Sequence, residues 1–123
     1  MVVAGERTVE ELFEGHPRSL ELCRAVEEAV GAVGDSTVTV GRSQVAFRRR
    51  RGFAYVWRPG QYVRSDVPAM LSLALPHRID SPRFKEVVHP SPGVWMHHLE
   101  LHEVAEVDAE VRGWLREAYE HAG

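Results

Sequence analysis

The sequence predicts an α+β domain in which an antiparallel sheet of four to five strands packs against two N-terminal helices and one C-terminal helix. Apolar residues recur at helical spacing over residues 17–34 and again after residue 104, whereas alternating patterns typical of strands lie between them. The length of 123 residues suits one domain, and no repeat or linker divides the chain. We therefore expect a single domain over residues 1–123, with residues 1–7 as a loose tail.

The helices are predicted from end signals and apolar spacing. Thr8 is followed three residues later by Glu11, a capping-box pattern that opens a short helix, and Gly15 is suited to end it. Pro17 fits the first turn of a second helix, and Gly34 marks its end. The core face of that helix is predicted to carry Leu22, Cys23, Val26, Ala29, Val30 and Val33. The C-terminal helix is predicted from Val104, Val107, Val111, Trp114, Leu115 and Ala118.

Alternating and β-branched residues predict strands at 37–40, 45–47, 53–57, 69–75 and 94–101. Gly52 is expected to supply the positive φ of a tight or bulged hairpin between the second and third of these. Ser81 and Pro82 resemble a helix cap and a first-turn proline, so one or two helical turns are predicted over residues 83–88.

Charge is unevenly distributed along the chain. Residues 36–65 contain seven arginines and no acidic residue, which leaves eight basic against 18 acidic residues elsewhere. No apolar run is long enough to span a membrane, and the N-terminus does not have the pattern of a signal peptide. The one cysteine, Cys23, cannot form an internal disulfide, so we expect a cytoplasmic protein with an inert core thiol.

Four segments together have a recognisable pattern: residues 45–47 with a basic run and residues 53–56, the strand that ends at Leu75-Pro76, residues 95–101, and residues 107–111 followed by Trp114-Leu115 and Ala118-Tyr119. This pattern resembles an uncharacterised bacterial family, the domain of unknown function 5655, over residues 13–119. The resemblance implies a compact α+β domain and brings neither an agreed activity nor catalytic residues.

The arginine run Arg48–Arg51 is the main candidate for binding. Guanidinium groups suit phosphate and carboxylate, and the aromatic residues beside the run are typical of sites that stack nucleic-acid bases. Successive side chains of a strand face opposite sides, however, so about half of the arginines can serve one site. A solvated hairpin tip, with the flanking aromatic residues buried, explains the run without any ligand and is the simpler interpretation.

His97 is the second candidate. Its parity with Trp95 and Leu99 favours a half-buried histidine whose hydrogen bonds are satisfied, but its nearness to the arginines also makes it a candidate for an anion pocket or a proton donor. The candidate ligand-binding residues are therefore Arg48, Arg50, Tyr55 and His97. No metal site is expected, since His98 and His102 would lie about 13 Å apart on a strand. No cofactor-binding motif or catalytic signature is present.

The leading hypothesis is a small non-enzymatic domain that binds an anionic partner through the arginine-rich hairpin. A phosphorylated small molecule, an acidic protein surface and a nucleic acid remain open as partners, with nucleic acid not favoured. One alternative is a small enzyme with His97 and Arg48 in a pocket between the sheet and the C-terminal helix. Another is a homodimer formed through the apolar strand at 69–75 and the tryptophans.

Overall fold

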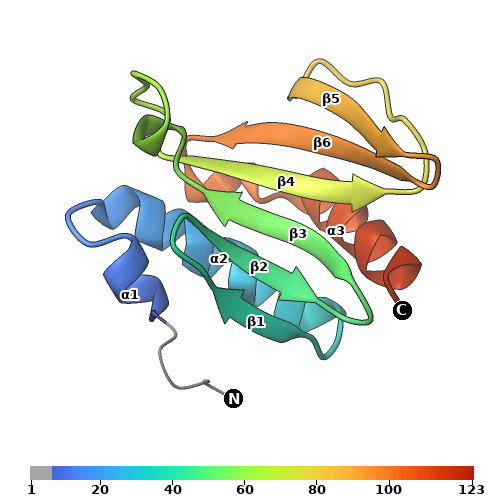
Figure 1. Ribbon diagram of the computed structural model, residues 1–123, viewed down its shortest axis with the longest axis horizontal. Coiled ribbons are helices and arrows are strands. Elements are labelled where there is room, and N and C mark those ends of the chain that lie inside the picture. Colours follow the sequence, from blue (N-terminus) through green and yellow to red (C-terminus); the bar gives the residue numbers. More distant parts are fainter. Residues whose placement is uncertain (1–6) are drawn as a thin grey trace.

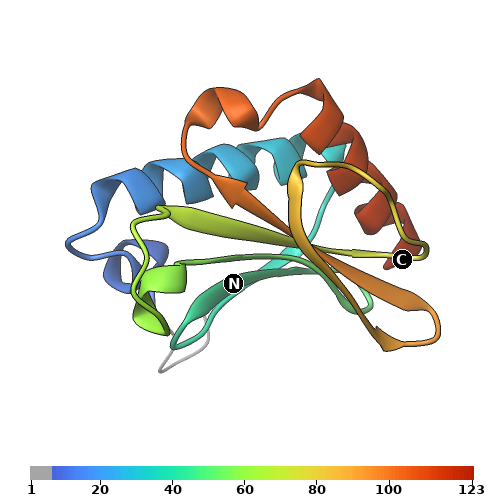
Figure 2. The ribbon, with the colours of Figure 1, turned by 90° about the horizontal axis from the view of Figure 1, so that it is seen from above.

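The computed structural model describes residues 7–123, and within them an antiparallel six-stranded sheet has its two long helices on one face (Figures 1 and 2). The predicted tail, apart from Arg7, lies outside the described residues. The strand order is β1-β2-β3-β4-β6-β5. The elements are α1 (Val9–Leu12), α2 (Pro17–Val33), β1 (Thr37–Val40), β2 (Gln44–Arg48), β3 (Gly52–Trp57), η1 (Pro59–Gln61), β4 (Ala69–Leu75), β5 (Phe84–Ser91), β6 (Val94–Leu101), η2 (Val104–Glu106) and α3 (Ala109–His121).

The predicted α+β class is confirmed, but the predicted number of strands was too low. The segment expected to form helical turns over residues 83–88 is instead β5, the edge strand that pairs with β6. Ser81 and Pro82 form only a turn, closed by a hydrogen bond from the Phe84 N–H to the Ser81 carbonyl at 3.2 Å. Two β-branched residues and Pro90 follow, and proline disfavours a helical residue before it. Pro90 is tolerated because β5 lies at the edge of the sheet.

Local end signals formed the helices as expected. The Thr8 hydroxyl accepts from the Glu11 N–H at 3.1 Å and the Glu11 carboxylate accepts from the Thr8 N–H at 2.8 Å, which completes the capping box. Gly15 ends this turn with a φ of 81°, in the region that favours glycine. The C-terminal helix begins later than Val104, because Asp108 caps α3 by accepting from the Val111 N–H at 3.0 Å.

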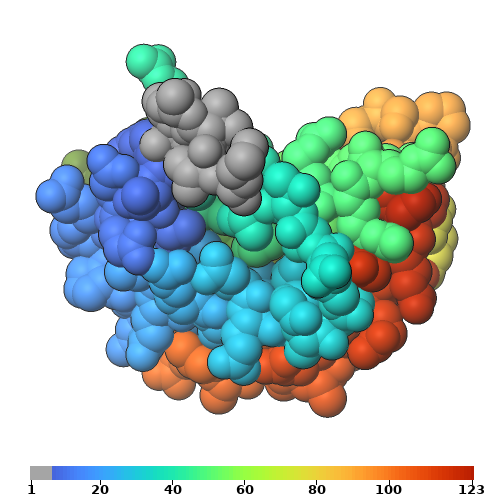
Figure 3. Space-filling view, turned by 90° about the horizontal axis from the view of Figure 1, so that it is seen from below, coloured from blue at the N-terminus to red at the C-terminus, as the bar shows by residue number. Residues whose placement is uncertain are grey.

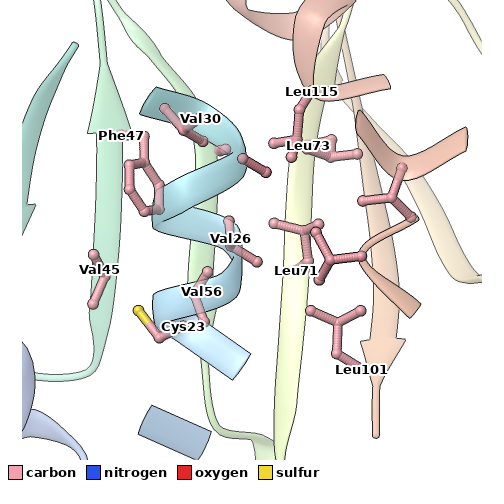
Figure 4. Packing of buried hydrophobic residues seen from close by; sticks show 14 of the residues in the cluster. Cys23, Val26, Val30, Val45, Phe47, Val56, Leu71, Leu73, Leu101 and Leu115 are labelled. Atoms are coloured by element: carbon pink, nitrogen blue, oxygen red, sulfur yellow. The ribbon is translucent and has the colours of Figure 1, made fainter. Parts of the chain in front are cut away.

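The core lies between the sheet and the helices α2 and α3. Figure 4 shows Val26 and Val30 of α2 among side chains of the neighbouring strands, and all of the labelled side chains are buried. Cys23 belongs to this cluster, and burial raises the pKa of its thiol to about 12, so the thiol is inert as predicted. The largest fully buried side chains of the sheet are Val45, Phe47, Phe53, Val56, Leu71, Leu73, Leu75, His97 and Leu101.

The opposite side of the sheet, here called the open face, is not covered by any helix that the structure describes (Figure 2). Strand alternation and register place on it Thr37 and Thr39 of β1, Gln44, Ala46 and Arg48 of β2, Tyr55 and Trp57 of β3, Met70, Ser72 and Ala74 of β4, Met96, His98 and Glu100 of β6, and Glu86 and Val88 of β5. The open face therefore combines aromatic, hydroxyl and charged side chains, whereas the helix-covered face is almost entirely apolar.

Candidate functional site

Two of the four predicted site residues, Arg48 and Tyr55, lie together on the open face. Tyr55 is directly opposite Ala46 on β2, and Arg48 is two residues further along that strand. The register shifts between Phe47 and Arg48, so Arg48 is paired with Gly52 rather than with Phe53. Arg50, in the turn that follows, lines a surface hollow together with Arg48. The rest of its lining is Asp35, Ser36, Thr37, Arg49 and Gly123. Arg48 and Arg50 thus line one hollow, whereas Tyr55 lines a separate pocket on the open face.

Gly52 permits this arrangement, although not through the positive φ that the sequence suggested. Within residues 7–123 only Gly15 has a positive φ. The hairpin is bulged beside Arg48, whose partner on β3 is Gly52, and the hydroxyl of Tyr55 occupies the space where a Cβ on Gly52 would stand. The Tyr55 ring therefore lies along the strand toward Arg48.

His97 does not join this region. It lies on the helix-covered face of β6, whereas Arg48 lies on the open face of β2, three strands away. Its side chain is fully buried, and Nε2 accepts from the Ile79 N–H at 3.0 Å while Nδ1 donates to the Trp95 carbonyl at 2.9 Å. Burial lowers its pKa. His97 is thus a core histidine with satisfied hydrogen bonds, as one interpretation held, although it is fully rather than half buried. It does not share a pocket with Arg48.

The arginine run divides between two roles. Arg49 donates to the Tyr119 carbonyl at 2.9 Å, and its guanidinium lies 4.1 Å from the centroid of the Tyr119 ring. Arg51 donates to the His121 carbonyl at 2.7 Å. Figure 3 shows the red C-terminal residues beside the green β2–β3 turn. These two arginines satisfy carbonyl groups at the negative end of α3. The side chains of Arg48 and Arg50 have no hydrogen-bond partner within residues 7–123.

A pocket lies on the open face, and Tyr55 is part of its lining. Its volume is about 480 Å³, and its lining is Gln44, Tyr55, Trp57, Tyr62, Ser72, Met96 and His98. The Trp57 ring makes edge contacts with Tyr62 and His98, at centroid distances of 5.9 and 6.1 Å. Tyr62 is 62% exposed and forms part of the rim. None of these lining residues is acidic or a permanent cation.

A chain of hydrogen bonds links three of the lining residues. Trp57 Nε1–H donates to the Ser72 hydroxyl at 2.9 Å, and the same hydroxyl lies 2.6 Å from Nδ1 of His98. Burial lowers the pKa of His98, although the carboxylate of Glu86 opposite it on β5 acts in the other direction. His98 therefore stays neutral near pH 7, in a pocket that presents hydrogen-bonding groups rather than charge.

Sequence reasoning named Tyr55 as a candidate but missed the rest of this pocket. Its simpler interpretation buried the aromatic residues of this strand, but the buried parity of β3 is that of Ala54 and Val56. The one available signal was Ser72, a single hydroxyl within the apolar segment 69–75. A hydroxyl in the middle of an apolar strand requires a partner, and the adjacent strand provides it.

The Ser72–His98 pair does not have the surroundings of a nucleophile and base. β4 is hydrogen-bonded to β3 on one side and to β6 on the other, so the backbone N–H groups beside Ser72 are used in the sheet. An oxyanion hole needs such donors to be free. The arrangement is therefore suited to binding and orienting a ligand, not to acyl transfer.

Two kinds of feature, a cluster of metal ligands and a membrane-spanning helix, are absent from the described residues. Over residues 7–123, no three His, Cys, Asp or Glu side chains gather closely enough to hold a metal ion. No helix in this part of the chain has the length and apolar character needed to cross a membrane.

Comparison with known proteins yields one match. A family model described as Domain of unknown function (DUF5655) matches residues 9–122. No curated protein and no solved structure matches the chain.

Proposed function

We propose that this chain, which belongs to the DUF5655 family, is a binding domain for an anionic ligand that carries a planar ring. The ring lies in the open-face pocket, and the anionic group lies at Arg48 and Arg50. The observation that carries the proposal is the position of Arg48, which shares the open face with Tyr55 and lies two residues beyond Ala46, the partner of Tyr55.

The chemistry of the pocket supports a planar ring. Tyr55, Trp57 and Tyr62 offer flat apolar surfaces, and aromatic side chains bind rings by offset stacking or edge contacts. Gln44 and His98 add hydrogen-bonding groups that fix the orientation of a ring but supply no charge. A pocket of about 480 Å³ is within the range of small-molecule sites.

The charge distribution supports an anion at the β2 end of the face. Residues 36–65, which include β1, β2 and β3, contain no acidic residue. The acidic side chains of the open face, Glu86 on β5 and Glu100 on β6, lie toward the opposite edge of the sheet. Asp35 is the one acidic side chain in the lining of the hollow beside Arg48. Arg49 and Arg51 are bonded to α3, whereas no side-chain hydrogen bond or ion pair within residues 7–123 holds Arg48 or Arg50. A nucleoside monophosphate combines the required ring and anion.

The test measures binding of nucleoside monophosphates, the matching nucleosides and inorganic phosphate, by calorimetry and by tryptophan fluorescence, to which Trp57 in the pocket contributes. We expect the monophosphates to bind best, with an affinity that falls as salt is added because the arginines are exposed. The double variant Arg48→Ala/Arg50→Ala should lose about tenfold or more in affinity, since charge-assisted hydrogen bonds are removed.

The matched control is Arg42→Ala/Arg64→Ala, which removes two exposed arginines of the same acid-free window that do not line the pocket or the hollow beside Arg48. It should leave the affinity within about twofold, the range expected for surface substitutions. Equal losses in the two double variants would mean that only overall charge matters, and the proposed site would then be wrong. Absence of binding by all of the probes would reject the function itself.

A further inference from the structure

The proton positions in the Trp57–Ser72–His98 chain follow from its donors and acceptors. The indole N–H can only donate, so the Ser72 oxygen accepts from Trp57. Ser72 is 3% exposed, and its own hydrogen has one acceptor within reach, Nδ1 of His98 at 2.6 Å. When Ser72 donates to Nδ1, every group in the chain has a partner. The proton of the neutral imidazole is then on Nε2.

The other tautomer leaves a buried group without a partner. With the proton on Nδ1, Ser72 would accept from both neighbours and its hydroxyl hydrogen would have no acceptor among the hydrogen bonds of residues 7–123. A buried polar hydrogen without an acceptor is costly. His98 lines the pocket, and Nε2 has no partner among the described residues. The pocket therefore presents one fixed N–H donor.

The sheet sets which end of a ligand meets this donor. Tyr55, Ser72 and His98 are direct cross-strand neighbours on β3, β4 and β6. Arg48 is on β2, three strand spacings of ~4.8 Å from His98 and two residues of ~3.3 Å further along, which places the two about 16 Å apart. A ligand held by its phosphate at Arg48 and by its ring over Tyr55 and Trp57 points the far edge of the ring at His98. In a nucleotide, that edge is the one opposite the sugar.

We infer that His98 makes the pocket selective for rings whose far edge carries a hydrogen-bond acceptor, that is, for keto bases such as uracil and hypoxanthine over the amino bases cytosine and adenine. This inference rests on the proposed function. Uracil O4 and hypoxanthine O6 accept from Nε2–H, whereas the exocyclic amino groups of cytosine and adenine are donors and would face another donor. Glu86, which is directly opposite His98 on β5, does not line the pocket.

The experiment compares two pairs of ligands that differ only at this edge. Affinities are measured for uridine and cytidine monophosphates and for inosine and adenosine monophosphates. We expect the keto member of each pair to bind about tenfold more tightly, the effect of one buried hydrogen bond. Equal affinities within both pairs would overturn the inference while leaving the proposed function in place. No binding of any of the four would instead reject the proposed function.

The variant His98→Asn tests whether this residue is responsible. Its side-chain oxygen can still accept from Ser72, but no donor remains at the position of Nε2, so the preference for keto bases should disappear. His102→Asn is the matched control, because His102 is exposed and outside the pocket, and it should keep the preference. A preference that persists in His98→Asn would overturn the assignment.

A measurement on the unmodified protein makes the inference independent of whether that variant folds. The nitrogen chemical shifts of the His98 ring report which nitrogen carries the proton. We expect a protonated Nε2 and an unprotonated Nδ1 near neutral pH. The reverse assignment would remove the donor and overturn the inference.

Discussion

Replacement of Arg49 by alanine tests whether the arginine run divides between structural and ligand-binding roles. Arg49 donates to the Tyr119 carbonyl at 2.9 Å and lies 4.1 Å from the centroid of the Tyr119 ring. His121 is the one basic residue of the last turn of α3, so the hairpin arginines supply positive charge to this end of the helix. Arg49→Ala removes that charge together with both contacts.

The expected loss follows from these contacts. A cation–π contact at an exposed site contributes about 0.5–1 kcal/mol, and charge at the end of a helix about 0.3–1 kcal/mol. With a partly solvated hydrogen bond included, we expect Arg49→Ala to lower the free energy of unfolding by about 1–2 kcal/mol. For a domain of this size, each 1 kcal/mol lowers Tm by roughly 3–6 °C.

The assay is urea denaturation followed by tryptophan fluorescence, with calorimetry for Tm. Arg48→Ala and Arg50→Ala are the matched controls, because both side chains are exposed and neither bonds to α3. Each should change the free energy of unfolding by less than about 0.5 kcal/mol while weakening ligand binding. The reasoning is refuted if Arg49→Ala is as stable as the unmodified protein, or if Arg48→Ala destabilises it to the same extent.

Two further predictions concern the core. Leu73→Ala, at a fully buried position, should lower the free energy of unfolding by about 2–5 kcal/mol in urea denaturation, and a loss below about 1 kcal/mol would contradict the packing described. Stability should also fall as pH drops below 6.5, the ordinary pKa of histidine, because burial lowers the pKa of folded His97 and the unfolded chain therefore takes up its proton first. The decline should end once the folded imidazole is protonated. His97→Leu should make the dependence shallower between about pH 7 and about pH 5, and an unchanged slope would mean that His97 does not contribute.

Elements with a strong local period were predictable from the sequence. The apolar spacing of α2, the alternation in β3 and β4 and the capping box at Thr8 each depend on residues within a few positions of one another. β5 was missed because a Ser-Pro pair such as Ser81-Pro82 can precede either a helix or a strand. The chain after it is extended because it pairs with β6, a partner that no local pattern identifies.

The candidate site was predictable only in part, and for a related reason. Alternation shows that Tyr55 and Trp57 share a face of β3, but it does not show which face the helices cover. The same ambiguity placed His97 near the arginines, whereas the structure buries it and brings its neighbour His98 to the pocket. A strand pattern thus defines two sets of side chains without saying which set meets solvent.

The sequence by itself determined the class of fold, most of its elements and the acid-free, arginine-rich window from residue 36 to 65. Only the tertiary structure decided that Arg49 and Arg51 bond to α3, that Arg48 lies beside Tyr55, and that Ser72 orients His98. The physical reason is the range of the interactions. Periodicity and capping involve residues a few positions apart in the sequence. Which face of a sheet the helices cover, and which partner each side chain meets, depend on segments that are tens of residues apart.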